Sequence, residues 1–170
     1  KVVLSRKIVL KEQIAIVETF QNLISTYPTA FRYLFFHPKI GLWMGATPEQ
    51  LVKINKNQFE TVALAGTQLY SENVIWATKE IEEQQFVTDY IVAKVKDKVN
   101  QLIVSDVKTV KAGNLAHLKS FISGELTTDF LANDLIKALH PTPAVCGLPK
   151  EKAIDFILKN EDYNRKYYAG

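Results

Sequence analysis

The segment KEIEEQQFVTDYIVAKVKDKV constrains the fold more strongly than any other part of the sequence. Val87, Ile91 and Val95 repeat every four residues. Tyr90 joins them on one side of a helix, because residues three and four apart share a helical face. An apolar stripe of this kind is buried against another element of the fold. The pattern therefore predicts a long helix over about residues 77–100 with one face in the core.

Shorter patterns on either side predict a mixture of strands and helices. Alternating apolar residues indicate a strand over 2–10, and AFRYLFFHP and GLWMGAT indicate a hairpin joined near Pro38. Helices are expected at 12–26, 128–139 and 149–160, and strands at QFETVALAGT and LIVSDVKTVKAG. A further short helix is expected at PEQLVKI, with Thr47 as its N-cap and Pro48 at its first position. This mixture predicts an α+β fold with a largely antiparallel sheet and packed helices.

Composition excludes several classes of protein. The net charge is +3 and the lysines are scattered, so no nucleic-acid partner is expected. No run of about 18 apolar residues is present, so no membrane span is expected either. The single cysteine, Cys146, excludes an internal disulfide and fits a reducing compartment, so a cytoplasmic protein is expected. The length suits one domain over 1–170, and both ends of the chain have the character of cuts from something longer.

Two carboxylates lie at the start of the predicted long helix. Projecting the apolar stripe backward by four and seven residues from Val87 reaches Glu83 and Glu80, whereas Glu82 points elsewhere. Acidic residues often collect at a helix N-terminus because the helix dipole favours them there, and they then remain in water. Two inward carboxylates can instead form a site for Mg²⁺, which takes oxygen ligands. Periodicity alone leaves both interpretations open.

Three other motifs carry polar groups that fit either a function or ordinary structure. Glu49 of GATPEQL is explained by a capping box, and Gly66 and Thr67 of ALAGT end an apolar strand. A glycine there lets a ligand approach the backbone, but a strand-ending turn is equally consistent. His117 lies between apolar neighbours, where a hydrogen-bonded structural histidine is the common case. A rigid, proline-rich loop leads into the last helix at HPTPAVCGLPKEKA.

The order of these motifs resembles the chorismate-binding enzyme family from end to end. The strings in order are KVVLSR, GATPEQL, ALAGT, KEIEEQQFVTDYI, AGNLAHL, HPTPAVCGLPKEKA and RKYYAG. The family includes anthranilate, aminodeoxychorismate, isochorismate and salicylate synthases, which bind chorismate beside Mg²⁺ in a cleft between two subdomains. The resemblance implies that 1–170 is a partial catalytic domain, without an N-terminal scaffold and a C-terminal part.

The resemblance assigns catalytic and metal-binding roles to four residues. Lys1 matches the general base that activates water in the water-using members, where ammonia-using members typically carry Gln. Glu49 matches the general acid that protonates the departing ring hydroxyl. Glu83 matches a magnesium ligand, and Glu80 matches a carboxylate one layer further from the metal. The family's second Glu pair, which completes the magnesium site, would fall beyond Gly170, so the chain alone is expected to be inactive.

The resemblance also assigns substrate contacts. Gly66 and Thr67 match a turn that holds a substrate carboxylate. His117 matches a histidine that lies at the substrate ring, and Tyr168 matches a tyrosine near the pyruvyl group. Members that form salicylate tend to carry Thr at the position of Ala144, which favours a reaction that stops at isochorismate.

These assignments together predict a magnesium-dependent isochorismate synthase serving menaquinone or siderophore synthesis, monomeric at full length, with chorismate as its small-molecule partner. The alternatives are a salicylate synthase of the same family and a non-catalytic remnant of the fold.

Overall fold

The computed structural model describes residues 1–47 and 49–168, and the chain divides into two compact units. The smaller unit is Arg6–Gln50, and the larger combines Lys1–Ser5 with the chain from Leu51 onward. Helices are mixed with antiparallel strands in both units, as the α+β prediction requires. No helix in the described part of the chain has the length and apolar character needed to cross a bilayer.

The smaller unit contains one helix and one hairpin. Helix α1 (Ile16–Thr26) contacts both strands of an antiparallel pair, β1 (Phe31–His37) and β2 (Gly41–Thr47). The predicted helix and hairpin are therefore confirmed, although the helix begins four residues later than its predicted start at 12. The turn between the strands ends at Gly41, whose φ of +95° lies in the region that favours glycine.

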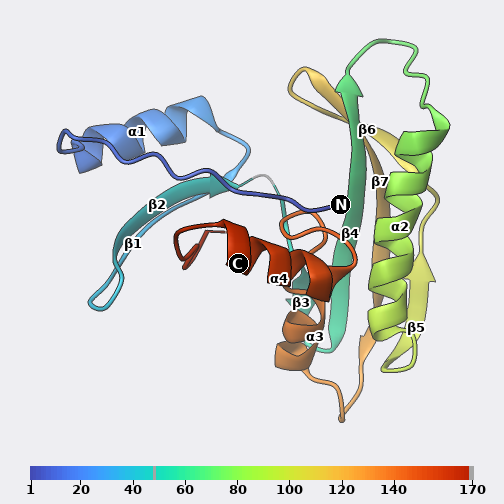
Figure 1. The fold of residues 1–170 in the computed structure, drawn as a ribbon. Coiled ribbons are helices and arrows are strands. Elements are labelled where there is room, and N and C mark those ends of the chain that lie inside the picture. The colour runs from blue at the N-terminus through green and yellow to red at the C-terminus, as the bar shows by residue number, and fades with distance from the viewer. Residues whose placement is uncertain (48, 169–170) are drawn as a thin grey trace. The chain divides into compact units, whose positions relative to one another are not determined.

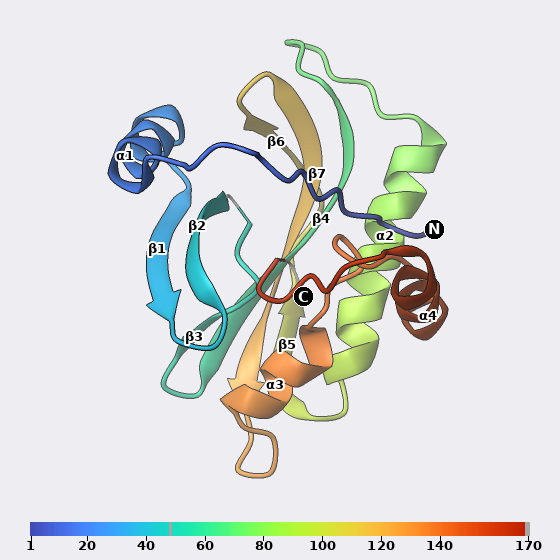
Figure 2. The same ribbon diagram turned by 60° about the vertical axis from the view of Figure 1, so that its left-hand side comes forward.

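The larger unit is built on a five-stranded antiparallel sheet. Its order is β3 (Lys53–Asn55), β4 (Gln58–Leu69), β7 (Leu115–Leu126) and β5 (Val99–Val104), and β6 (Lys108–Ala112) also pairs with β7. Helix α2 (Thr78–Val95) packs along one face of β4 and β7 (Figure 1, Figure 2). The buried core consists of Phe59, Ala63, Ile91, Val95, Ile122, Phe130, Leu135 and Leu139.

The central strand β7 was not predicted, although it pairs with three of its neighbours. Its burial alternates regularly, but the polarity of two neighbouring residues departs from the usual pattern. Ser120 is 1% exposed and Phe121 is 40% exposed, so the polar residue faces the helix and the aromatic one faces outward. The buried serine is tolerated because Gln84 of α2 donates a hydrogen bond to its hydroxyl at 3.0 Å.

The strand predicted over 102–113 is in fact two strands. β5 pairs with the C-terminal part of β7 and β6 with its N-terminal part. Between them, the Ser105 hydroxyl accepts a hydrogen bond from the Phe121 N–H at 2.9 Å, and the Ser105 N–H donates to the Phe121 carbonyl at 2.9 Å. The serine side chain thus replaces one rung of the ladder and lets the chain change direction.

Two other predicted elements were wrong. No helix follows Thr47: residues 49–52 are irregular and Lys53 opens strand β3, while Pro48 lies outside the described residues. The predicted strand over 2–10 is reduced to a single bridge between Val2 and Gly147. The helix was predicted from a capping pattern and the strand from apolar alternation, and in both places the pairing of the chain with other segments decides the structure.

The long helix and the last two helices agree with their predictions. Helix α2 spans Thr78–Val95 within the predicted range and buries Ile91 and Val95. Helix α3 (Ala132–Leu139) is shorter than predicted, and α4 (Lys150–Asn160) begins directly after Pro149.

Candidate active site

A cleft of about 1040 Å³ lies in the larger unit between α2, strand β4 and the loop before α4. Four consecutive residues of β4, Leu64 to Thr67, line it. Because successive strand residues point to opposite faces, a run of four means that the edge of the strand borders the cleft. From Thr61 onward, β4 has a described partner on one edge only. The remaining lining residues are Lys1, Lys79, Glu80, Glu83, Phe86, Val87, Tyr90, Pro143, Ala144, Gly147, Leu148 and Pro149.

Helix α2 directs two carboxylates into this cleft. Glu80 and Glu83 line the cleft and are partly buried, whereas Glu82 between them is exposed. The Lys1 ammonium lies 3.7 Å from Glu83 Oε1, with the lysine side chain 68% exposed and the glutamate side chain 33% exposed. Val87 and Tyr90 of the predicted stripe line the cleft together with the two acids. The buried positions of α2 are Gln84, Thr88, Ile91 and Val95, of which the first two were not part of the predicted stripe.

A β-bulge in β4 lets the start of α2 approach the strand closely. Gly66 has a φ of +70°, and the register with β7 shifts between Ala65 and Thr67. A Cβ at this position would lie 3.2 Å from the Glu80 Cβ and 3.4 Å from its carbonyl oxygen. Glycine is needed both for the backbone angle and for the space. The bulge also leaves Gly66 and Thr67 at the cleft edge, where their backbone groups can meet a ligand.

The start of the chain pairs with the loop that precedes α4. The Val3 N–H donates to the Cys146 carbonyl at 3.1 Å, and the Leu148 N–H donates to the Lys1 carbonyl at 3.0 Å. The backbone nitrogen of Lys1 in turn donates to the Leu148 carbonyl at 2.9 Å. This short antiparallel ladder is what places Lys1 and Ala144 at the same cleft.

Gly147 is required for this ladder. Its φ is +111°, and a Cβ there would collide with the Lys1 carbonyl and the Val2 Cα.

We expect Gly147→Ala to lower the free energy of unfolding by about 3 kcal/mol or more, since backbone strain and a backbone collision act together. Gly113→Ala is the matched control, because Gly113 also has a positive φ (+61°) but nothing within 4 Å of the added atom. The control should cost about 1–2 kcal/mol. Urea unfolding measures both, and equal losses would contradict the predicted collision.

The structure brings some of the other predicted site residues to the cleft and leaves others away from it. His117 is not among the lining residues; its Nδ1 lies 3.0 Å from the Thr67 hydroxyl and 3.2 Å from the Gly66 carbonyl oxygen. It therefore contacts the bulge of β4 from the neighbouring strand β7. Tyr168 is 57% exposed and does not line the cleft.

Glu49 belongs to the smaller unit. Its N–H donates to the Thr47 hydroxyl at 3.3 Å, and because the two residues are only two positions apart this is a local turn contact, not the hydrogen bond of a capping box, which spans three positions. Desolvation raises the pKa of the Glu49 carboxyl, even though the residue as a whole is exposed. A raised pKa is what a general acid requires, because the proton must still be present near neutral pH.

Several cleft residues were not anticipated as part of a site. Lys79 and Phe86 line the cleft from α2, and Tyr90 lines it from the core stripe. The Tyr90 hydroxyl is buried and has no hydrogen-bond partner in the described structure, and burial raises its pKa. No single-sequence signal separates these residues from ordinary helix positions. Among the described residues there is no cluster of three or more His, Cys, Asp or Glu side chains able to hold a metal.

Comparison with known proteins identifies the family. The family model described as chorismate binding enzyme matches residues 1–170, so the chain belongs to that family. It is 32% identical over 150 residues to isochorismate synthase MenF from Pasteurella multocida, covering 82% of this chain and 35% of the relative. It is 32% identical over 139 residues to isochorismate synthase DhbC from Bacillus subtilis, covering 75% of this chain and 35% of the relative.

A solved structure shows the same fold. A Bacillus anthracis protein assigned as the 2,3-dihydroxybenzoate-specific isochorismate synthase DhbC superposes with a TM-score of 0.76 at 26% identity, over 91% of this chain and 46% of that chain. The chain thus spans about a third of these two curated relatives and about half of the solved structure.

Proposed function

We propose that the full-length protein, meaning the whole product of the gene that encodes this chain, converts chorismate to isochorismate. The observation that carries this proposal is the convergence of four separate segments on one cleft. Lys1, the Gly66–Thr67 bulge, the acidic turn of α2 and the loop containing Ala144 all line it. These segments match the motifs to which the family resemblance assigns the base, the carboxylate-binding turn, the metal ligands and the position that separates isochorismate from salicylate formation.

The donor set on α2 fits a magnesium ion. Glu80 and Glu83 present carboxylate oxygens to the same cleft, and Mg²⁺ prefers such ligands together with water and substrate oxygens. Glu83 would bind the ion and Glu80 would lie behind it. Bound Mg²⁺ would neutralise the ring carboxylate of chorismate and hold the ring in place. Two carboxylates on one helical turn form half of a site, so further oxygen ligands are expected from the substrate and from the full-length protein.

The proposed reaction needs one proton removed and one delivered. The Lys1 amine accepts a proton from the attacking water, and the Glu49 carboxyl donates a proton to the departing ring hydroxyl. Both groups return to their starting states when the protons are exchanged with solvent. The proposed step requires no covalent intermediate and no organic cofactor, because it consists of these two proton transfers, the attack of water and the departure of the hydroxyl. The raised pKa of Glu49 supports its assignment as the acid.

The test is to incubate purified full-length protein with chorismate and Mg²⁺ and to separate the products by chromatography. Isochorismate without pyruvate supports the proposal. Salicylate with an equal amount of pyruvate, measured with lactate dehydrogenase, would instead identify a salicylate synthase. The absence of both products, together with no chorismate affinity in calorimetry, would show a non-catalytic member of the family.

The pathway served by the reaction is a separate part of the proposal. Relatives carry names associated with menaquinone and with siderophores such as vibriobactin. We propose that the isochorismate formed here feeds one of these two pathways. Deleting the gene and supplementing growth separately with menaquinone or with iron would distinguish them.

A further inference from the structure

A hydrogen-bonded ion pair joins the end of α4 to the segment that follows it. Arg165 Nε donates to Glu161 Oε2 at 2.7 Å, and a second guanidinium nitrogen donates to Oε1. The side chains are only 13% and 6% exposed. The arginine holds the pKa of the Glu161 carboxyl down at about 2, so the pair is charged at any working pH.

The same guanidinium reaches two backbone segments that are far apart in sequence. One nitrogen donates to the Val145 carbonyl at 2.9 Å and another to the Val3 carbonyl at 3.0 Å. Val145 is next to Ala144, and Val3 is two positions after Lys1. Arg165 therefore contacts both segments of the short ladder that places Lys1 at the cleft.

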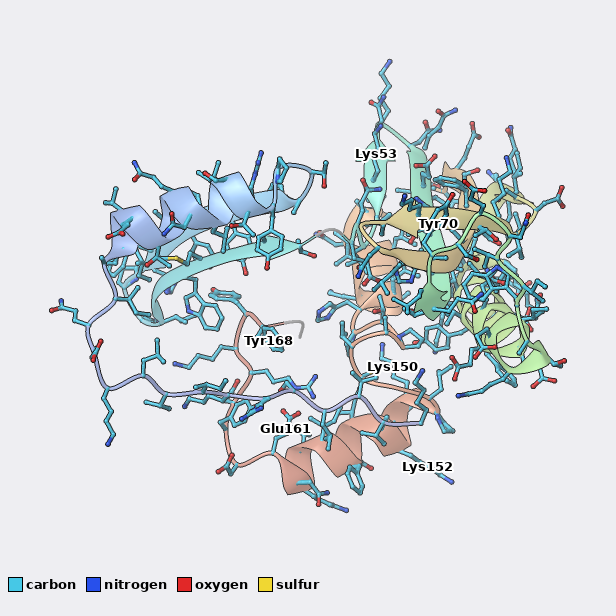
Figure 3. The ribbon with its side chains drawn as sticks, turned by 90° about the horizontal axis from the view of Figure 1, so that it is seen from above. Lys53, Tyr70, Lys150, Lys152, Glu161 and Tyr168 are labelled. Atoms are coloured by element: carbon cyan, nitrogen blue, oxygen red, sulfur yellow. The ribbon has the colours of Figure 1, made fainter. Side chains whose placement is uncertain are left out.

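Glu161 holds the same segment at a second point. Its Oε1 accepts the Ser5 N–H at 2.7 Å and the Ser5 hydroxyl at 3.0 Å. The Ser5 hydroxyl also lies 2.7 Å from the Tyr163 hydroxyl. Figure 3 shows Glu161 at the end of α4, directed toward the segment near the N-terminus. The segment is thus fixed on one side by the ladder and on the other by the ion pair.

We propose that Glu161 and Arg165 are positioning residues for the Lys1 amine and for the Ala144 side of the cleft, an inference that rests on the proposed function. The Lys1 side chain is long and 68% exposed, and its ammonium lies 3.7 Å from Glu83 Oε1, so the position of its backbone sets which part of the cleft the amine can reach. The backbone of this segment, Lys1 included, is held by the ladder, by Arg165 and by Glu161. A displacement of the order of 1 Å at a reacting group is enough to cost about 10²-fold in rate.

The kinetic test uses Arg165→Lys and Glu161→Gln in the full-length protein. Lysine keeps the charge but lacks the planar fork that reaches a carboxylate and two carbonyls together. We expect kcat for isochorismate formation to fall about 10- to 100-fold, with KM for chorismate and the Mg²⁺ dissociation constant within about 3-fold of the unmodified protein. Lys159→Met, on the exposed side of the same helix, is the matched control and should change none of these. An unchanged kcat in both test variants, or a loss confined to KM, overturns the positioning role.

A second readout does not depend on activity. The amides of Val3, Ser5 and Leu148 donate hydrogen bonds within the ladder and to Glu161, and their hydrogen exchange can be followed directly. In the Arg165→Lys variant these amides should exchange at least about 10-fold faster while the buried Ile122 amide in β7 keeps its rate. Equal acceleration at Ile122 would mean general loosening and overturn the proposal, as would unchanged exchange at all four. Failure of the unmodified protein to form isochorismate would instead overturn the proposed function.

Discussion

Glu49→Gln in the full-length protein is expected to lower kcat for isochorismate formation by about 10²- to 10⁴-fold, because an amide cannot donate the proton that the departing hydroxyl needs. Lys1→Ala should cause a loss of similar size, because it removes the proposed base of the same reaction. Both substitutions should leave the free energy of unfolding within about 0.5 kcal/mol, since each residue as a whole is exposed and neither lies in the core.

The measurement is steady-state kinetics with chorismate, beside urea unfolding of each variant. Glu18→Gln is the matched control for Glu49, because Glu18 is an exposed glutamate in the same unit. It should retain full activity. Isochorismate formation near the unmodified rate by Glu49→Gln would remove Glu49 from the mechanism, and the same result for Lys1→Ala would remove Lys1.

Glu83→Gln in the full-length protein is expected to weaken Mg²⁺ binding by at least about 10- to 100-fold. A neutral amide is a poorer ligand than a carboxylate for a hard cation, and the site loses a negative charge that offsets the charge of the ion. The chain offers a close control in Glu82→Gln, which changes the same residue type one position away. Glu82 is exposed and does not line the cleft, so its substitution should leave Mg²⁺ affinity unchanged.

Calorimetric titration with Mg²⁺ in the presence of chorismate measures both variants. Because Glu83 also lies 3.7 Å from the Lys1 ammonium, a loss of activity alone would not separate a metal effect from an effect on the lysine. The metal dissociation constant does separate them. Equal affinities for the Glu83 and Glu82 variants would show that the acidic turn of α2 is not the metal site.

The orientation of the two acids was predictable from the sequence because it depends on local periodicity. Once Val87 is placed on the apolar side of the helix, the position of Glu80 and Glu83 follows from the number of residues per turn. Both acids line the cleft beside Val87. The last helix was predictable for a related reason: Pro149 suits a helix start, and α4 begins at the next residue. The hairpin of β1 and β2 likewise depends on neighbours in the chain.

Errors arose where a segment takes its structure from distant parts of the chain. Strand β7 has a buried serine and an exposed phenylalanine, and only the hydrogen bond from Gln84 explains why the serine can be inside. Residues 49–52 lack the helix that the capping pattern suggested, because the chain there leads into the pairing of β3 with β4. A propensity of a few tenths of a kcal/mol per residue is overridden by strand pairing and burial.

The sequence by itself determined the C-terminal part of the buried face of α2, where Ile91 and Val95 lie, together with the order of the motifs and, through that order, the family. Only the tertiary structure decided that Lys1 meets Glu83, since the ladder between the start of the chain and Cys146–Leu148 joins residues separated by nearly the whole chain. It also decided that Arg165 and Glu161, which in sequence are an ordinary pair four residues apart, hold that ladder in place. The physical reason is that helical periodicity is set within a few turns, whereas the partner of an extended segment is chosen by the packing of the whole fold.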